Sequence, residues 1–289
     1  MLLRRFTFGL VLRYVLLSLA TLPLAAQKVP TPSAARILLL PKRIVAGEPV
    51  TVAVLDVSGR LTPGVTVNFS GGSHIVTNAT GRALFVAPPK PGVIYATIGE
   101  RSARVYTTIL TTAEVSSSPV HLSSAPQFAS LTDRFELSGS GFCGDADKNR
   151  VRVAGKPALV LASSPAALIV LPPPDLEPGP AKIETSCGER SGSTVSSTFL
   201  DLSLDADSSP LAPGEHRTLK VDVRGTAAKV SLEALNLSPK VAELTGGNPA
   251  KTSSSGGLEN AARFDVVGRE HGNFLISVRL LPMQTPLRH

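Results

Sequence analysis

Short runs of alternating apolar and polar residues recur along most of the chain. In the run 65–70, VTVNFS, valine and phenylalanine occupy every second position and polar side chains occupy the positions between them. The run 219–224, LKVDVR, has the same period of two. This period places apolar side chains on one face of a β-strand. No long stretch has the 3.6-residue period of an amphipathic helix, so the pattern predicts an all-β protein.

Turn-forming segments separate these runs. Glycine and proline occur 24 times each and gather in segments such as TNATG, KPG and GERS. Turns that recur every ~8–12 residues are typical of a β-sandwich. We therefore expect three sandwiches in a row, at 35–112, 120–202 and 203–281. The serine- and proline-rich segment 111–126 is interpreted as a linker.

The first two predicted sandwiches resemble known families. AGEPVTVAVLD, GVTVNF and TNATGRALF, all within 46–85, are similar to bacterial Ig-like domains of invasin-type surface proteins. FELSGSGF, NRVRVAG, LIVLPP and the Pro-Gly turn before AKIETSCG resemble, in that order, the IPT/TIG family of Ig-like domains. The resemblance implies tandem Ig-like β-sandwich domains in an exported bacterial protein. The third module resembles no family and is predicted from its pattern alone.

The first 26 residues have the pattern of a secretory signal peptide. Basic residues precede an apolar run that ends in small residues, and cleavage is expected after Ala26. An uncleaved membrane anchor is the alternative, but Arg13 interrupts the apolar run, which is shorter than the ~20 residues of a spanning helix. No later segment is long and apolar enough to span a membrane. The expected location is the periplasm, the cell surface or the medium.

The charge of the chain does not indicate nucleic acid binding. The formal net charge is +7, three of these charges belong to signal-peptide arginines, and the remaining basic residues are scattered. Aromatic residues make up only 4% of the chain and tryptophan is absent. Nucleic acid binding needs a basic stripe and usually aromatic stacking surfaces. No nucleic acid partner is therefore expected.

The chain contains only two cysteines, Cys143 and Cys187, and both lie in the second predicted sandwich. Exported proteins fold under oxidising conditions, which favours a disulfide between them. A reactive thiol or a metal site is the alternative. The first would need a histidine partner and the second more ligands than two isolated cysteines.

Motifs for catalysis or for cofactor binding are missing from the sequence. The five histidines are scattered, and no nucleophile elbow, phosphate loop or zinc-protease helix is present. DADKNR begins like a calcium loop but has Arg150 where glycine is required and Lys156 where glutamate is required. We therefore expect no enzyme activity, no catalytic residue, no metal and no cofactor. A non-standard calcium site and a separated pair of catalytic carboxylates stay open.

Our leading hypothesis is a non-catalytic exported binding, adhesion or spacer protein at the cell envelope. Its partner would be a protein or an envelope glycan that contacts loops or strand edges. The alternatives are a carbohydrate-binding accessory module, against which the scarcity of aromatic residues counts, and a structural subunit of a periplasmic or outer-surface assembly. Each candidate loop is equally well explained as an ordinary solvated loop. The candidate contact residues are Ser73, His74, Asp145, Asp147, Asn149, Asn248 and Lys251.

Overall fold

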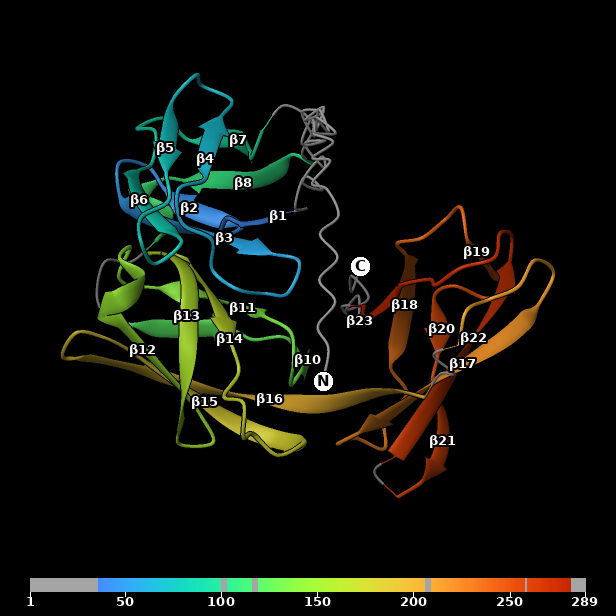
Figure 1. Cartoon of the computed structure of the whole chain (residues 1–289). Helices are drawn as coiled ribbons and strands as arrows, with labels where there is room; N and C mark the ends of the chain where they lie inside the picture. The colour runs from blue at the N-terminus through green and yellow to red at the C-terminus, as the bar shows by residue number, and fades with distance from the viewer. Residues whose placement is uncertain (1–35, 100–102, 116–118, 206–208, 258, 282–289) are drawn as a thin grey trace, which may run out of the picture. The chain divides into compact units, whose positions relative to one another are not determined.

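The computed structural model of the protein describes residues 36–99, 103–115, 119–205, 209–257 and 259–281 (Figure 1). The predicted signal peptide lies outside the described residues. The described chain consists of strands, turns and two single-turn 3-10 helices, η1 (Thr112–Glu114) and η2 (Ala146–Lys148). The prediction of an all-β fold is confirmed. Among the described residues there is no helix with the length and apolar character needed to cross a membrane.

The first sandwich has two sheets that enclose one hydrophobic cluster. One sheet has the order β1-β3-β6, and the other has the order β2-β8-β7-β4-β5. Alternation directs Val50, Val52 and Val54 of β3 inward, where they are fully buried. The strands are β1 (Arg36–Leu39), β2 (Arg43–Val45), β3 (Pro49–Asp56), β4 (Thr66–Phe69), β5 (His74–Val76), β6 (Arg82–Val86), β7 (Gly92–Thr97) and β8 (Val105–Leu110).

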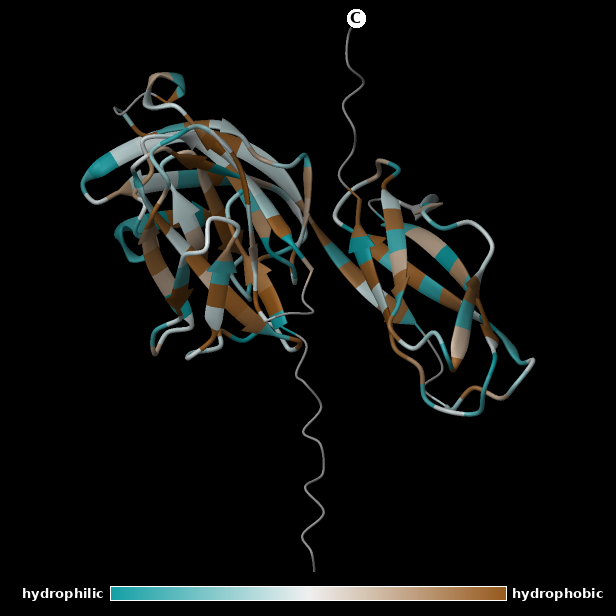
Figure 2. Ribbon diagram, turned by 90° about the horizontal axis from the view of Figure 1, so that it is seen from above, coloured by the Kyte–Doolittle hydropathy of each residue, from teal (hydrophilic) through white to brown (hydrophobic). Residues whose placement is uncertain are grey.

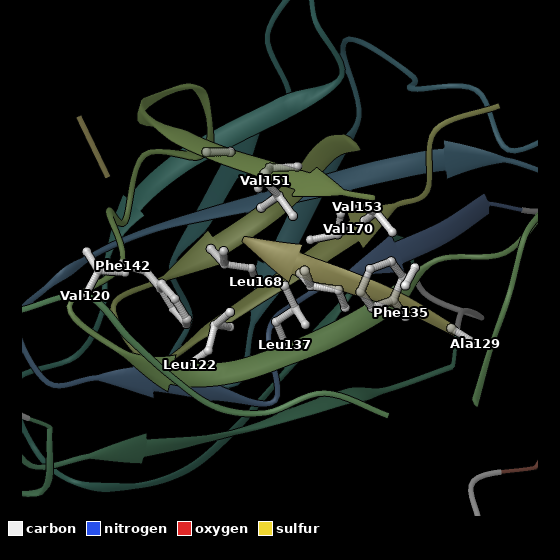
Figure 3. Close-up of a cluster of buried hydrophobic side chains, with 14 of the residues drawn as sticks. Val120, Leu122, Ala129, Phe135, Leu137, Phe142, Val151, Val153, Leu168 and Val170 are labelled. Carbon is white, nitrogen blue, oxygen red and sulfur yellow. The ribbon is translucent and has the colours of Figure 1, made fainter. Parts of the chain in front are cut away.

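The second sandwich encloses its own cluster, in which Phe135, Leu137, Leu168 and Val170 point toward one another (Figure 3). β13 pairs with β12 through its first residues and with β14 through its later ones, so it belongs to both layers. The strands are β9 (His121–Ser124), β10 (Phe128–Ser130), β11 (Phe135–Ser140), β12 (Asn149–Val153), β13 (Lys156–Ser164), β14 (Ala167–Leu171), β15 (Gly179–Cys187) and β16 (Arg190–Asp205).

The third module is also a sandwich with a separate cluster of buried side chains. β16, β17, β22, β19 and β21 form one sheet, and β20, β18 and β23 form the other. Hydrophilic and hydrophobic segments alternate along these strands, as in the other sandwiches (Figure 2). The strands are β17 (His216–Arg224), β18 (Ser231–Asn236), β19 (Ala242–Thr245), β20 (Ala250–Lys251), β21 (Ser253–Gly256), β22 (Glu259–Gly268) and β23 (Ile276–Leu280).

A single strand joins the second sandwich to the third. The first part of β16 pairs with β15, and its last part, Asp201–Asp205, pairs with β17. Phe199 is fully buried in the second cluster, and its neighbour Leu200 is fully buried in the third. Successive side chains of a strand point to opposite faces, which allows adjacent residues to enter different cores. The two sandwiches therefore meet within a strand.

The first and second sandwiches meet through a buried apolar contact and through one backbone pair, Thr51 of β3 with Ser163 of β13. Leu39, Ala53 and Leu55 of β1 and β3 form a cluster with Leu161, Ala162 and Ile169 of β13 and β14. These side chains lie on the outer faces of their sheets. The segment interpreted as a linker takes part in the structure as well, because Val115 is buried and β9 pairs with β11. The connection is therefore shorter and more structured than the sequence predicted.

Candidate functional site

The acidic loop that contains three candidate contact residues packs against the first sandwich. The Thr51 hydroxyl donates a hydrogen bond of 2.8 Å to the Gly144 carbonyl and accepts one of 3.1 Å from the Ala146 amide. Asp147 Oδ1 lies 2.6 Å from Arg82 Nη1. A Cβ on Gly144 would lie 1.9 Å from the Pro49 carbonyl oxygen, so only glycine fits this approach.

The same loop is organised internally. Asn149 is buried, and its side-chain amide donates to the carbonyls of Cys143 at 2.7 Å and Asp145 at 3.0 Å. The Asp145 side chain accepts a hydrogen bond of 3.1 Å from the Asp147 amide and caps η2. Asp145, Asp147 and Asn149 therefore all have partners within the chain. The described residues hold no group of three or more His, Cys, Asp or Glu side chains that could bind a metal ion.

Cys143 and Cys187 form a disulfide, with Cα atoms 5.5 Å apart. Cys143 comes immediately before Gly144, and Cys187 is the last residue of β15. The disulfide therefore fixes the start of the loop that contacts the first sandwich.

The remaining candidate contact residues lie in two separate places. Ser73 and His74 are exposed at the turn into β5. Asn248 and Lys251 are exposed in the third sandwich, where the Asn248 side chain donates to the Ala234 carbonyl at 2.8 Å. Among the described residues, no hydrogen bond, ion pair or ring contact joins a candidate of the first sandwich to one of the third. Of these four residues, His74 lies on the five-stranded sheet of the first sandwich, whereas Lys251 lies on the short strand β20.

The five-stranded sheet of the first sandwich has an outer side that faces away from the core. Ile94 and Ala96 of β7 point into the core, so alternation directs Val93, Tyr95 and Thr97 outward. On β8, Val105 and Ile109 pack in the core, so alternation directs Tyr106 outward. We call this surface the tyrosine face, and it comprises Arg43, Thr66, Asn68, His74, Val76, Val93, Tyr95, Thr97, Arg104, Tyr106 and Thr108.

Two tyrosines occupy neighbouring positions on the tyrosine face. Tyr95 and Tyr106 are register partners, with ring centroids 5.7 Å apart and ring planes inclined by 57°. Tyr106 is 55% exposed. The guanidinium carbon of Arg104 lies 4.6 Å from the centroid of the Tyr95 ring, within the range of a cation–π contact. Arg104 and the two tilted rings therefore lie next to one another on this face.

Polar groups border the tyrosines. Asn68 of β4 is the register partner of His74 on β5 and of Thr97 on β7, which places three polar side chains in one row. The Tyr95 amide donates to the Ser70 hydroxyl at 3.3 Å. Neither phenol hydroxyl has a hydrogen-bond partner within the part of the chain that the structure describes. The face thus combines an aromatic surface with hydroxyl, amide and imidazole groups.

The tyrosine face was not predicted from the sequence, because the low number of aromatic residues alone gives no sign of it. The signal was present in the strands VIYATI and ARVYTTIL. Tyr95 and Tyr106 each occupy the outward phase of an alternating run, and the short segment between the runs predicts a hairpin. Two outward residues of neighbouring strands can be register partners, which the pattern alone could have suggested.

Comparisons with known proteins do not identify the chain. No family model matches it, and no curated protein is similar to it in sequence. The resemblance to invasin-type and IPT/TIG domains therefore stays a prediction. Solved structures with similar folds include two Bacteroides proteins and a surface layer protein.

A Bacteroides ovatus SGBP-B from a mixed-linkage glucan utilization locus, in complex with a mixed-linkage heptasaccharide, is similar at 13% identity and a TM-score of 0.33, over 86% of this chain and 75% of that chain. An auxiliary nutrient binding protein from Bacteroides thetaiotaomicron has 19% identity and a TM-score of 0.26, over 35% and 25%. Domains 1–6 of the surface layer protein SbsC have 15% identity and a TM-score of 0.21, over 86% and 39%. At these scores the similarities carry no argument about function.

Proposed function

We propose that this chain is a non-catalytic glycan-binding protein and that the tyrosine face is its binding surface. The observation that supports the proposal is the position of Tyr95 and Tyr106 side by side on an open sheet. Sugar rings present C–H groups that pack against aromatic rings, and their hydroxyls need hydrogen-bond partners. A tyrosine supplies both an apolar ring and a polar tip.

The surroundings of the two tyrosines favour a glycan over a protein partner. Two aliphatic side chains of this face are exposed, Val76 and Val93. Asn68, His74 and Thr97 offer hydrogen-bond donors and acceptors in one row. The fully buried cores of protein interfaces are depleted in charged residues and are more apolar than the rest of the surface. This proposal gives the carbohydrate-binding alternative of the sequence analysis a specific surface.

Binding can be followed directly with the chain's own fluorescence. Tryptophan is absent, so Tyr95 and Tyr106 dominate the emission of the mature protein. The whole chain would be screened on a glycan array and then titrated with an oligosaccharide of each polymer that binds. We expect a saturable change in tyrosine emission.

Variants separate stacking from hydrogen bonding. Tyr106→Ala should weaken glycan binding by about tenfold or more, about 1.4 kcal/mol, because it removes the exposed ring. Tyr106→Phe should retain most of the affinity because it keeps the ring. Leu84→Ala changes a side chain that is 57% exposed on the other sheet of the same sandwich, and it serves as the control. Equal affinity of Tyr106→Ala and Leu84→Ala for every bound glycan would refute the proposal.

We further propose that the protein acts outside the cytoplasm. The predicted signal peptide and the Cys143–Cys187 disulfide support this location, because disulfides persist in oxidising compartments. Mass spectrometry of the protein from its native host should find Gln27 as the first residue and both cysteines oxidised. A full-length reduced protein in the cytoplasmic fraction would contradict this location.

A further inference from the structure

The second sandwich has a groove of about 330 Å³ on the outer side of β12, β15 and β16. Its lining side chains are those of arginine, glutamate, serine and threonine, together with Gly192, and none of these residues belongs to the tyrosine face. We call it the arginine groove and define it by Arg150, Arg152, Glu184, Ser186, Ser191 and Thr194.

The strand register arranges this lining in two rows. Arg150 is the partner of Ser186, which in turn is the partner of Ser191. Arg152 is the partner of Glu184, which in turn is the partner of Thr194. Adjacent strands are ~4.8 Å apart, and residues two positions apart along a strand are separated by ~6.6 Å. Each arginine therefore lies at the end of a row that contains at least one hydroxyl group.

The charge of the groove is positive. Arg150 and Arg152 are exposed, and neither forms an ion pair with another residue of the described chain. The carboxylate of the groove, Glu184, is paired with Lys182 at 3.3 Å. An arginine guanidinium presents two parallel N–H groups that match the oxygens of a carboxylate or a sulfate. The groove therefore has two guanidinium groups available for an anionic ligand.

We infer that the arginine groove binds acidic polysaccharides through their carboxylate or sulfate groups. The serine and threonine hydroxyls match the hydroxyls of a sugar chain. The lining contains no aromatic ring on which a nucleic acid base could stack, and no apolar centre of the kind that protein interfaces bury. The inference concerns the second sandwich and does not depend on the proposed function of the tyrosine face.

The test measures binding of the whole chain to polygalacturonate, with neutral dextran as the matched polymer, at low and high sodium chloride. We expect binding to polygalacturonate that weakens with salt, because salt screens exposed charges. The double variant Arg150→Ala/Arg152→Ala should lose about tenfold or more of the affinity, since it removes both charge-assisted contacts. Arg150→Lys/Arg152→Lys should recover part of this loss.

A matched control removes the same charge elsewhere. Lys240 and Arg263 are both exposed in the third sandwich and have no ion-pair partner among the described residues. Lys240→Ala/Arg263→Ala should keep polygalacturonate binding within about twofold of the parent protein. Thermal unfolding would verify that all variants are folded.

Several results would overturn the inference. They are the absence of polygalacturonate binding, equal binding to dextran, and equal losses in the groove and control variants. Tighter binding to single-stranded oligothymidylate than to polygalacturonate would indicate that the ligand of the groove is a nucleic acid. If inorganic sulfate binds as tightly as polygalacturonate, the groove is a site for small anions and not for a polysaccharide.

Discussion

The two junctions between the sandwiches are built in different ways. The first sandwich meets the second mainly through side chains, with an apolar cluster and the buried hydrogen bonds of Thr51 and Arg82. A single backbone pair, Thr51 of β3 with Ser163 of β13, adds to this contact. The second meets the third through the backbone of one strand, β16, whose neighbouring residues Phe199 and Leu200 enter different cores. A side-chain contact can be opened without unfolding either partner, whereas a shared strand couples two cores directly.

This difference bears on which surfaces stay open for binding. The side-chain contact covers the outer faces of β1 and β3 and of β13 and β14. It leaves the tyrosine face of the first sandwich and the arginine groove of the second uncovered. The acidic loop, which the sequence suggested as a binding loop, is used within the chain to hold the first two sandwiches together.

The largest expected effect comes from the shared strand. Phe199→Ala should destabilise the second sandwich by about 3–5 kcal/mol, and Leu200→Ala should destabilise the third by about 2–5 kcal/mol, because each truncation leaves a cavity in a different core. Hydrogen exchange on each variant would show which strands lose protection. Loss of protection in the same sandwich for both variants would contradict the assignment of the two residues to separate cores.

Removal of the disulfide should have the next largest effect. The bond spans a sequence separation of 44 residues, for which the chain-entropy model gives about 4 kcal/mol as an upper value. Cys143→Ala/Cys187→Ala should therefore cost about 2–4 kcal/mol in urea unfolding. Protection should also fall at Thr51, which contacts the loop that begins at Cys143. Unchanged hydrogen exchange at Thr51 would show that the disulfide does not stabilise the contact between the first and second sandwiches.

The ionic contact of the first junction should contribute less. Arg82 is 8% exposed and donates to Asp147 at 2.6 Å and to the Val160 carbonyl at 2.8 Å. Arg82→Ala should cost about 2 kcal/mol because it leaves that carbonyl without its charged donor. Arg279→Ala breaks an exposed pair with Glu233 in the third sandwich and should cost below about 1 kcal/mol. Chemical denaturation would compare them, and equal costs would contradict a buried role for Arg82.

The smallest expected effect is a pH dependence at the same junction. Burial raises the pKa of Glu136 above its ordinary value of 4.5, although Lys42, whose amide donates to Glu136 Oε1 at 3.2 Å, opposes the shift. The folded protein therefore binds the proton of the Glu136 carboxyl more tightly than the unfolded chain does. Ionisation of Glu136 lowers the stability of the folded protein, and this loss is complete above the folded pKa. That loss fades as the pH falls toward 4.5.

Glu136→Gln should therefore be more stable than the parent protein at neutral pH, and the difference should disappear below about pH 4.5. Thermal unfolding across this pH range would measure it. Glu114 provides a control of opposite sign, because hydrogen bonds from the Thr111 amide and hydroxyl lower the pKa of that carboxyl. Parallel pH profiles for the two glutamine variants would contradict the assigned cause.

The sequence predicted what depends on local pattern. Alternation in runs such as 65–70 and 219–224 identified strands and their buried faces, and the position of the two cysteines within one module suggested their pairing. The contacts of Arg82 and Gly144 could not be predicted, because they join residues of different sandwiches that no local pattern relates. The tyrosine face could be predicted in part. Its two strands were recognised from the sequence, but the register that pairs Tyr95 with Tyr106 was not.

The central claim is that glycans bind to the ring surfaces of Tyr95 and Tyr106. The chain has only three tyrosines, and one of them, Tyr14, belongs to the predicted signal peptide. NMR of the mature protein with carbon-13-labelled tyrosine rings should therefore show two sets of ring signals. On titration with an oligosaccharide that binds, both sets should shift and saturate together with binding. Ring signals that stay fixed while the oligosaccharide binds would place the binding surface elsewhere and contradict the account.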